Sequence, residues 1–277
     1  MRKRTPKWER VAKLPMMPYQ HILFEVDQNG VALLTVNRPE KRNALSIELI
    51  GELRDAIEQV AQTSAIRALI LTGAGDKAFI AGADIRELAS TAPFELRELA
   101  LRGQSAFRQL EKCGKPSVAA INGYALGGGL ELAMACTVRF ASENAQMGQP
   151  EVKLGIIPGY GGTQRLPRLV GRGRALELLL SGEAIPAREA YRIGLVNAVL
   201  PQSELLAYSR TWLDKVLANA PIAVGLAMQA VDAGLDVGLD AGMLLEAGAF
   251  GICAATEDLR EGTSAFLEKR PPVFAGK

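Results

Sequence analysis

Residues 122–131 read Asn-Gly-Tyr-Ala-Leu-Gly-Gly-Gly-Leu-Glu and lead into the apolar segment Leu-Ala-Met-Ala at 132–135. Consecutive glycines cost backbone entropy, so a chain that places them directly before a helix needs bare backbone there. The first N–H groups of a helix have no partner within it, and they share the direction of the positive dipole end. Glu131, one turn into this helix, is a candidate acid–base group beside those donors. A structural interpretation, in which the glycines only let the helix pack tightly, stays open.

The segments around this stretch alternate between strand and helix patterns. Two β-rich runs at 21–26 and 31–36 flank a turn that contains Gly30, which predicts a hairpin. Ser46 is a candidate N-cap for a helix through residue 62. Strands are expected at 66–71 and 117–121, with a helix at 93–112 between them. This order predicts an α/β fold with mostly parallel strands, whose functional loops follow the carboxyl ends of strands.

Composition excludes several classes of protein. The chain has 277 residues, 48% of them hydrophobic, and a formal charge of +2, so no overall field favours nucleic acid or a membrane surface. No membrane-spanning run or secretory signal is present, and a cytoplasmic location is expected. Cys113, Cys136 and Cys253 are widely spaced and are expected to be reduced and buried. His21 is the single histidine, so neither a histidine-based triad nor a metal site is expected.

The chain divides into three parts by pattern. Residues 1–17 carry a cluster of basic side chains and are expected to form a flexible arm, with a solvated tail preferred over a nucleic-acid or membrane contact. Residues 18–200 form the expected α/β core. Residues 201–277 lose the strand pattern and show apolar residues at helical spacing. The apolar faces of this helical region indicate subunit contacts, with packing on its own core as the competing interpretation.

Two further segments carry candidate chemistry. Residues 79–85, Phe-Ile-Ala-Gly-Ala-Asp-Ile, are expected to form a glycine-containing loop after the strand at 66–71. Two loops at strand ends, each presenting N–H groups, can hold one oxygen between them as an oxyanion hole. The second segment is Gln-Pro-Glu at 149–151, in which proline restricts the direction of the glutamate. Glu131 and Glu151 are therefore candidates for a carboxylate pair, although spacing alone does not bring them together.

These segments, together with 37–45, 158–166 and 266–274, resemble the enoyl-CoA hydratase (crotonase) family. The resemblance runs in the same order from about residue 21 to residue 274, and only the basic arm lies outside it. It implies a crotonase-like spiral of repeated strand–strand–helix (ββα) units. It also implies that the C-terminal helices build a homotrimer, often as a hexameric dimer of trimers.

The resemblance also assigns roles to residues at the site. Glu131 and Glu151 would be the catalytic carboxylates, with Glu151 as main proton donor to the α-carbon and Glu131 as the group that positions and deprotonates water. The N–H groups of Ala83 and Gly128 would hold the thioester oxygen in the oxyanion hole. Gly159 would offer a further N–H near the catalytic water.

Coenzyme A binding is implied for three more positions. The backbone around Ala81 and Ile85 would meet the adenine end, and Lys269 would lie near the phosphates, possibly across a subunit boundary. Coenzyme A enters as part of the acyl-CoA substrate, so no separate cofactor and no metal is implied. Residues 85–102 and the surroundings of Tyr160 are expected to shape the acyl pocket, whose chain-length preference the sequence does not define.

The implied function is that of an enoyl-CoA hydratase, a lyase of acyl-CoA and fatty-acid metabolism. It would add water reversibly across the α,β double bond to give a 3-hydroxyacyl-CoA. An enoyl-CoA isomerase or another crotonase-family activity is the alternative within the family, although isomerases generally keep one of the two glutamates. RNA binding through the basic arm is the alternative from another class, but the core shows no aromatic residues interleaved with basic ones. A dinucleotide-binding oxidoreductase lacks its Gly-x-Gly-x-x-Gly signature here.

Overall fold

The structure is a computed structural model that describes residues 19–277, so the predicted arm at 1–17 lies outside the described residues. The described chain forms two compact units. The first contains residues up to Cys113 and Ser117–Arg210, and the second contains Gly114–Pro116 and Thr211–Lys277. The domain boundary predicted at residue 201 stays a prediction. Along the chain, the boundary between the compact units falls after Arg210, inside helix α7 (Leu205–Leu217).

A six-stranded sheet forms the centre of the first unit. Its strands follow the order β1-β2-β3-β5-β7-β10, with β1 antiparallel to β2 and the other neighbours parallel. The strands are β1 (Ile22–Val26), β2 (Val31–Val36), β3 (Ala68–Gly73), β5 (Ser117–Ile121), β7 (Val138–Ser142) and β10 (Ala198–Leu200). Residues of β3 and β5 are buried throughout, as expected for parallel strands covered on both faces.

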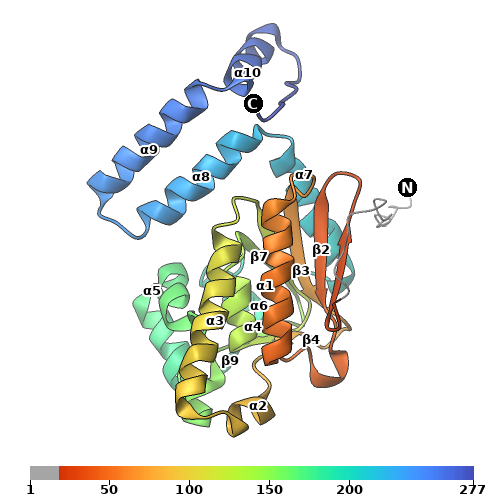
Figure 1. Ribbon diagram of the computed structural model, residues 1–277, viewed down its shortest axis with the longest axis vertical. Helices are drawn as coiled ribbons and strands as arrows, with labels where there is room; N and C mark the ends of the chain where they lie inside the picture. Colours follow the sequence, from red (N-terminus) through yellow and green to blue (C-terminus); the bar gives the residue numbers. More distant parts are fainter. Residues whose placement is uncertain (1–18) are drawn as a thin grey trace. The chain divides into compact units, whose positions relative to one another are not determined.

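A second, four-stranded sheet has the order β4-β6-β8-β9. Its strands are β4 (Ala78–Ala81), β6 (Tyr124–Leu126), β8 (Gln146–Gly148) and β9 (Ala184–Pro186). Along the chain, one strand of the first sheet is followed by one of the second sheet and then by a helix, in β3-β4-α2, β5-β6-α4 and β7-β8-α5. This repetition confirms the predicted ββα spiral, which Figure 1 shows as layers of sheet and helix.

The prediction that residues 79–85 form a loop was wrong for the first three of them. Residues Ala78–Ala81 form a strand of their own, paired in parallel with β6 in the second sheet. A second unexpected strand, β6, lies in residues 122–127, between β5 and helix α4. Such three- and four-residue strands are too short for a periodic pattern, and their hydrogen-bonding partners lie far away in sequence.

Helices cover the sheets of the first unit. They are α1 (Ile47–Gln62), α2 (Ile85–Ser90), α3 (Pro93–Glu111), α4 (Gly128–Met134), α5 (Gly162–Ser181) and α6 (Ala187–Arg192), with 3-10 turns η1 (Pro39–Lys41), η2 (Pro150–Leu154) and η3 (Gln202–Glu204). The predicted cap of α1 is present, since the N–H of Leu49 donates to Ser46 Oγ at 3.2 Å. Helices α1 and α3 pack side by side (Figure 1).

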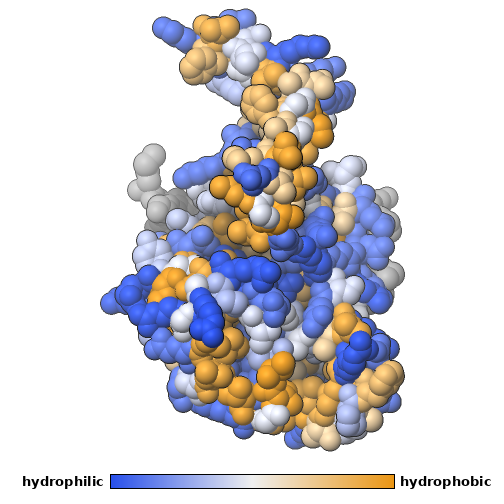
Figure 2. Space-filling view, turned by 90° about the vertical axis from the view of Figure 1, so that its left-hand side faces the viewer, coloured by the Kyte–Doolittle hydropathy of each residue, from blue (hydrophilic) through white to orange (hydrophobic). Residues whose placement is uncertain are grey.

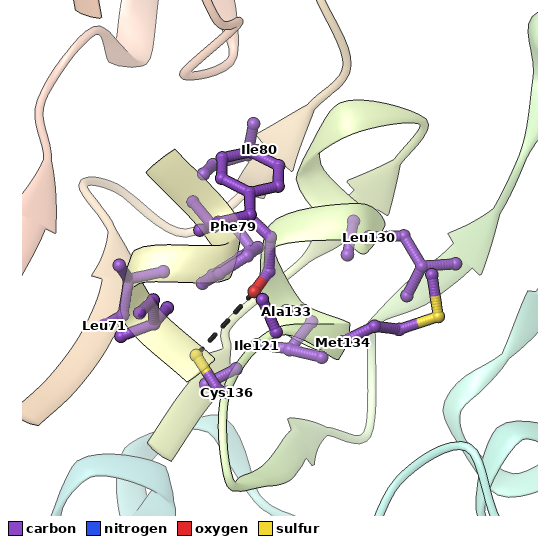
Figure 3. Packing of buried hydrophobic residues seen from close by; sticks show 14 of the residues in the cluster. Leu71, Phe79, Ile80, Ile121, Leu130, Ala133, Met134 and Cys136 are labelled. Atoms are coloured by element: carbon purple, nitrogen blue, oxygen red, sulfur yellow. Dashed lines mark hydrogen bonds between the residues drawn. The ribbon is translucent and has the colours of Figure 1, made fainter. Parts of the chain in front are cut away.

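Helix α4 is buried on all sides in the core. Its side chains Leu130, Ala133 and Met134 lie among Ile80 and other apolar residues of the strands around it (Figure 3). A Cβ on Gly129 would overlap the carbonyl oxygen of Ile80, so this glycine lets α4 lie directly on β4. Close packing therefore explains Gly129, as the structural interpretation of the glycine run expects.

The three cysteines are free thiols. Cys136 is buried beyond the end of α4, with its Sγ 3.7 Å from the carbonyl oxygen of Leu132 (Figure 3). Cys113 and Cys253 are only half-buried, so the expectation of three buried thiols was wrong for these two. The first follows the end of α3, and the second lies in a helix without buried residues.

The regular secondary structure of the second unit is helical, as its apolar spacing predicted. After α7 come α8 (Pro221–Gly234), α9 (Leu239–Ala254) and α10 (Glu257–Glu268). Large apolar side chains are exposed along these helices, as the orange surface in Figure 2 shows, and they include Leu239, Leu244, Phe250, Phe266 and Leu267. Across residues 19–277, no single helix is long and apolar enough to span a membrane. Two bent pairs of helices pass that test together, by length and composition only. One pair joins 202–217 to α8, and the other joins α9 to α10.

Candidate active site

The two glycine-containing loops leave the second sheet side by side. Strands β4 and β6 pair in parallel, with Ala81 opposite Leu126 at their carboxyl ends. A Cβ on Gly127 would lie 3.7 Å from the Cα of Gly82, so the loops remain in contact one residue further on. Residues 83 and 128 each lie two positions beyond the paired residues. The sheet therefore brings together the two segments that the sequence analysis singled out separately.

Both predicted oxyanion donors have an available N–H group. No residue in the described part of the chain accepts a hydrogen bond from the N–H of Ala83 or of Gly128. Around Ala83 the loop is fixed, because the N–H of Leu45 donates to the Gly82 carbonyl at 2.8 Å and the N–H of Asp84 donates to the Leu45 carbonyl at 2.7 Å. Gly128 is the first residue of α4, where a helix leaves its N–H groups without partners. Fixed donors of this kind suit a developing oxyanion.

Glu131 lies in the first turn of α4 and is only 1% exposed. Its Oε1 accepts hydrogen bonds from the N–H of Tyr160 at 2.7 Å and from the N–H of Gly162 at 2.6 Å. Burial raises the pKa of Glu131 to about 7, although these backbone donors and the charge of Arg165 lower it. A carboxyl group with a pKa near neutral pH can both accept and release a proton during turnover.

Arg165 fixes the loop that holds Glu131. Its Nη1 donates to the carbonyl oxygen of Tyr160 at 2.7 Å, and its Nη2 donates to Glu111 Oε2 of α3 at 3.0 Å. The guanidinium and the Glu111 carboxylate are both largely buried, so the pair is shielded from water. Arg165 therefore ties the 158–162 loop, which binds Glu131, to α3.

Glu151 lies in the 3-10 turn η2, directly after Pro150, and is 8% exposed. A Cβ on Gly127 would come within 2.8 Å of Glu151 Oε1, so this carboxyl group lies against the glycine that precedes the donor Gly128. Gly127 has φ +50°, a conformation that favours glycine. The requirement for bare backbone at the glycine run is therefore met here by the close approach of a carboxyl group.

The buried side chain of Gln149 hydrogen-bonds to the carboxyl group of Glu151. Its side chain is fully buried, and with its amide nitrogen turned toward Glu151 it donates to Oε1 at 2.9 Å and to Oε2 at 3.0 Å. The amide also lies near Glu131: in the same orientation, a Cβ on Gly162 would lie 2.9 Å from the amide oxygen of Gln149 and 3.1 Å from the Cγ of Glu131. The sequence showed Gln-Pro-Glu at 149–151 but gave no sign that the glutamine contacts the glutamate.

The two glutamates are close enough to influence each other's titration. Burial raises the pKa of Glu151 to about 7, and the negative charge of Glu131 raises it further. Adjacent carboxyl groups titrate as a coupled pair and share one proton when their like charges repel. The structure thus joins the two candidate carboxylates that spacing could not connect.

The remaining predicted site residues lie as follows. Gly159 is in the 158–162 loop, where its carbonyl accepts from Gln104 Nε2 at 2.8 Å. The N–H of Ala81 is already used, since it donates to the Arg42 carbonyl at 3.1 Å. Ile85 is the first residue of α2 and is half exposed. Lys269 is exposed at the C-cap of α10 in the second unit. The predicted roles of these four residues in substrate binding stay predictions.

Sequence reasoning missed the donors to Glu131. These donors are the N–H groups of Tyr160 and Gly162. The glycines around Tyr160 were the available signal, because Gly161 has φ +109° and lets the loop turn its N–H groups inward. No group of His, Cys, Asp and Glu that could hold a metal occurs within residues 19–277.

The fold and the site together define a class of protein. Two buried, coupled carboxyl groups beside two N–H donors, on a spiral of ββα units, are typical of an enzyme that moves protons at a carbon next to a polarised carbonyl group. The family described as enoyl-CoA hydratase/isomerase matches residues 26–277. The chain belongs to this family.

Similar proteins agree with this assignment. The crotonyl-CoA hydratase of Syntrophomonas wolfei is 48% identical over 261 residues, covering 94% of this chain and all of the relative. The short-chain-enoyl-CoA hydratase of Clostridium acetobutylicum is 46% identical, covering 92% of this chain and 97% of the relative. The crystal structure of enoyl-CoA hydratase from Bacillus anthracis superposes with a TM-score of 0.90 at 42% identity, covering 93% of this chain and all of that chain.

Proposed function

We propose that Glu131 and Glu151 perform the reaction of this protein, which is an enoyl-CoA hydratase. The reaction is the reversible addition of water across the α,β double bond of an enoyl-CoA thioester to give a 3-hydroxyacyl-CoA. One observation carries the proposal: two buried carboxyl groups with pKa values raised to about 7 lie beside the two N–H groups of Ala83 and Gly128.

The N–H groups polarise the substrate. When Ala83 and Gly128 donate to the thioester oxygen, the β-carbon becomes electrophilic and negative charge develops on that oxygen. Each donor contributes about 3 kcal/mol to the transition state, by analogy with other oxyanion holes. The donors need no rearrangement during the reaction, because the sheet and the start of α4 already fix them.

The two carboxyl groups move the protons. The two backbone N–H bonds to Glu131 favour its ionised form, which suits the base that takes a proton from water. The water oxygen bonds to the β-carbon while Glu151 gives its proton to the α-carbon. Transfer of the proton from Glu131 to Glu151 then restores the pair. The atoms balance, and the scheme uses no metal, nucleotide cofactor or covalent nucleophile.

Coenzyme A binding is proposed for the residues that the family resemblance implies. The backbone at Ala81 and Ile85 lies at the end of β4 and the start of α2, next to the oxyanion donor Ala83. This position supports a contact with coenzyme A while the thioester is in the site. Lys269 at the end of α10 supplies a positive charge for the phosphates. Coenzyme A is part of the substrate and not a resident cofactor.

The second unit supports a proposal about assembly. Its helices expose several large apolar side chains, among them Leu244 at 76% and Phe250 at 77% of their surface. Monomeric proteins rarely expose contiguous apolar surface of this kind, so we propose a homotrimer or a dimer of trimers. The similarity to bacterial enoyl-CoA hydratases supports the cytoplasm as its location, which we also propose. Sedimentation velocity at micromolar concentration should give a trimer or hexamer, and a monomer would contradict the proposal.

The loss of enoyl thioester absorbance tests the function. Purified protein should hydrate crotonyl-CoA and produce 3-hydroxybutyryl-CoA, with no added metal or nucleotide. A panel of short, medium and branched enoyl-CoA substrates covers the chain lengths that the family uses. If the folded protein leaves every one of them unchanged, the proposed function is wrong.

A further inference from the structure

Tyr160 presents a buried aromatic ring next to the reaction centre. The residue is 6% exposed, and its ring meets that of Phe107 edge to face, with centroids 5.6 Å apart and an interplanar angle of 75°. Phe107 belongs to α3 and is fully buried. The Tyr160 ring is therefore held in one position by α3 and not free to swing with its loop.

Two glycines on different helices make room for this ring. A Cβ on Gly103 of α3 would overlap the Tyr160 ring. A Cβ on Gly128 of α4 would lie 3.0 Å from the Cδ2 of Tyr160. The ring thus fills the space between α3 and the residue that carries the proposed oxyanion donor. Its position is fixed relative to the place where the thioester carbonyl would bind.

The backbone of the same residue binds the catalytic carboxylate. The N–H of Tyr160 donates to Glu131 Oε1 at 2.7 Å, so the ring is attached to the segment that orients the proposed base. A substrate with its carbonyl oxygen at Gly128 must place its β-carbon near Glu131. The first end of this three-carbon unit borders the ring of Tyr160, and the second borders its backbone N–H. The same residue therefore lies beside both ends, where the acyl carbons that follow begin.

We propose that the Tyr160 side chain closes the acyl end of the site and makes the enzyme selective for short-chain enoyl thioesters. The inference rests on the proposed hydratase function and adds the class of substrate to it. The packed Tyr160 ring occupies the volume that further methylene groups of a longer acyl chain would need. Close-packed interiors give way little, so a long chain must displace packed groups or leave the site.

Relative rates on straight-chain substrates test the proposal. We expect the kcat/KM of the wild-type enzyme to fall at least tenfold from crotonyl-CoA through hexenoyl-CoA and octenoyl-CoA to decenoyl-CoA. In the Y160A variant, the ratio of decenoyl-CoA to crotonyl-CoA should rise at least tenfold, because each methylene group newly buried favours binding by about fourfold. The readout is a ratio within one enzyme, so a general loss of activity does not alter it.

Two further variants control this experiment. Tyr191 lies on α6 and is 57% exposed, so Y191A removes a tyrosine ring away from the site and should leave the ratio unchanged. Y160L keeps an apolar side chain and should move the ratio in the same direction as Y160A, by less. If thermal unfolding shows that Y160A does not fold, Y160L carries the test.

A binding measurement on the wild-type enzyme needs no substitution. Saturated acyl-CoA inhibitors from butyryl-CoA to decanoyl-CoA should bind more weakly as the chain lengthens. A flat wild-type profile, or a ratio in the Tyr160 variants within twofold of wild type, would overturn the role of Tyr160 while leaving the hydratase function intact. Binding of acyl-CoA without turnover of any enoyl-CoA would instead contradict the proposed function.

Discussion

Glu131 and Glu151 reach similar pKa values in different surroundings. Helix α4 holds Glu131, and the 158–162 loop binds it through two backbone N–H groups. The turn η2 holds Glu151, and its hydrogen-bond partner on the same segment is the side chain of Gln149. Burial is the first cause of the raised pKa in both cases. A side-chain substitution can therefore remove the partner of Glu151 directly, whereas the donors to Glu131 belong to the backbone.

The largest expected effect follows removal of either carboxylate. E131Q and E151Q should each lower kcat for crotonyl-CoA by about 100-fold or more, which is the range for general acid–base groups. E183Q provides the matched control, because Glu183 is exposed and pairs with Lys153 in a surface ion pair, so its rate should stay at the wild-type value. A near wild-type rate for E131Q or E151Q would remove that residue from the mechanism.

Replacement of Gln149 tests the side-chain partner of Glu151 alone. Q149L removes two donated hydrogen bonds from a buried carboxylate and should lower kcat by about 10- to 100-fold, with little change in KM. Loss of donors to the ionised form raises a carboxyl pKa, so the pH profile of kcat/KM should move to higher pH. A uniform loss of rate at every pH, without a shift, would show that Gln149 only supports the fold.

The contact between Gly127 and Glu151 predicts a smaller effect. G127A adds a Cβ within 2.8 Å of Glu151 Oε1 at a residue with φ +50°, and should lower kcat about tenfold by displacing that carboxyl group. G171A is the control, because Gly171 has φ +77° and open space around its Cβ position. Equal kcat values for the two variants, measured with crotonyl-CoA, would mean that the contact with Glu151 has no influence on catalysis.

Stability should respond to pH through the same carboxyl groups. The pKa of Glu151 is about 7 in the folded protein, against an ordinary value of 4.5. Between pH 4.5 and pH 7, the folded state therefore retains a proton that the unfolded state has released. Stability from this group is complete below pH 4.5 and is lost as the pH rises toward 7. E151Q should therefore have a larger free energy of unfolding than wild type at pH 8, by about 1–3 kcal/mol, and so a higher unfolding temperature, with little difference at pH 4.5. Equal unfolding temperatures at both pH values would contradict the raised pKa.

Much of the fold could be predicted from local pattern. The hairpin β1–β2, helix α1 with its Ser46 cap and the helices after residue 201 appear where the apolar spacing placed them. These elements are long enough for a period to be visible, and their ends carry turn or capping residues. The family resemblance supplied the spiral, which no single segment could define.

The rest depends on contacts between distant segments. Strands β4, β6, β8 and β9 are three or four residues long, and their pairing sets the two oxyanion loops side by side. The donors of Tyr160 and Gly162 reach Glu131 because positive φ at Gly161 turns the loop, which a propensity argument does not reveal. Gln149 contacts Glu151 across a proline, a geometry that two positions in a sequence do not specify. The site was predictable in its residues, and its hydrogen bonds were not.

The double variant tests most directly whether Glu131 and Glu151 work as one pair. Crotonyl-CoA hydration should be measured for wild type, E131Q, E151Q and the E131Q/E151Q variant under identical conditions. When two groups share one proton, the effects of replacing them are not additive. The double variant should therefore lose about as much kcat as the less active single variant. A loss equal to the product of the two single losses would show two independent groups and would contradict the account.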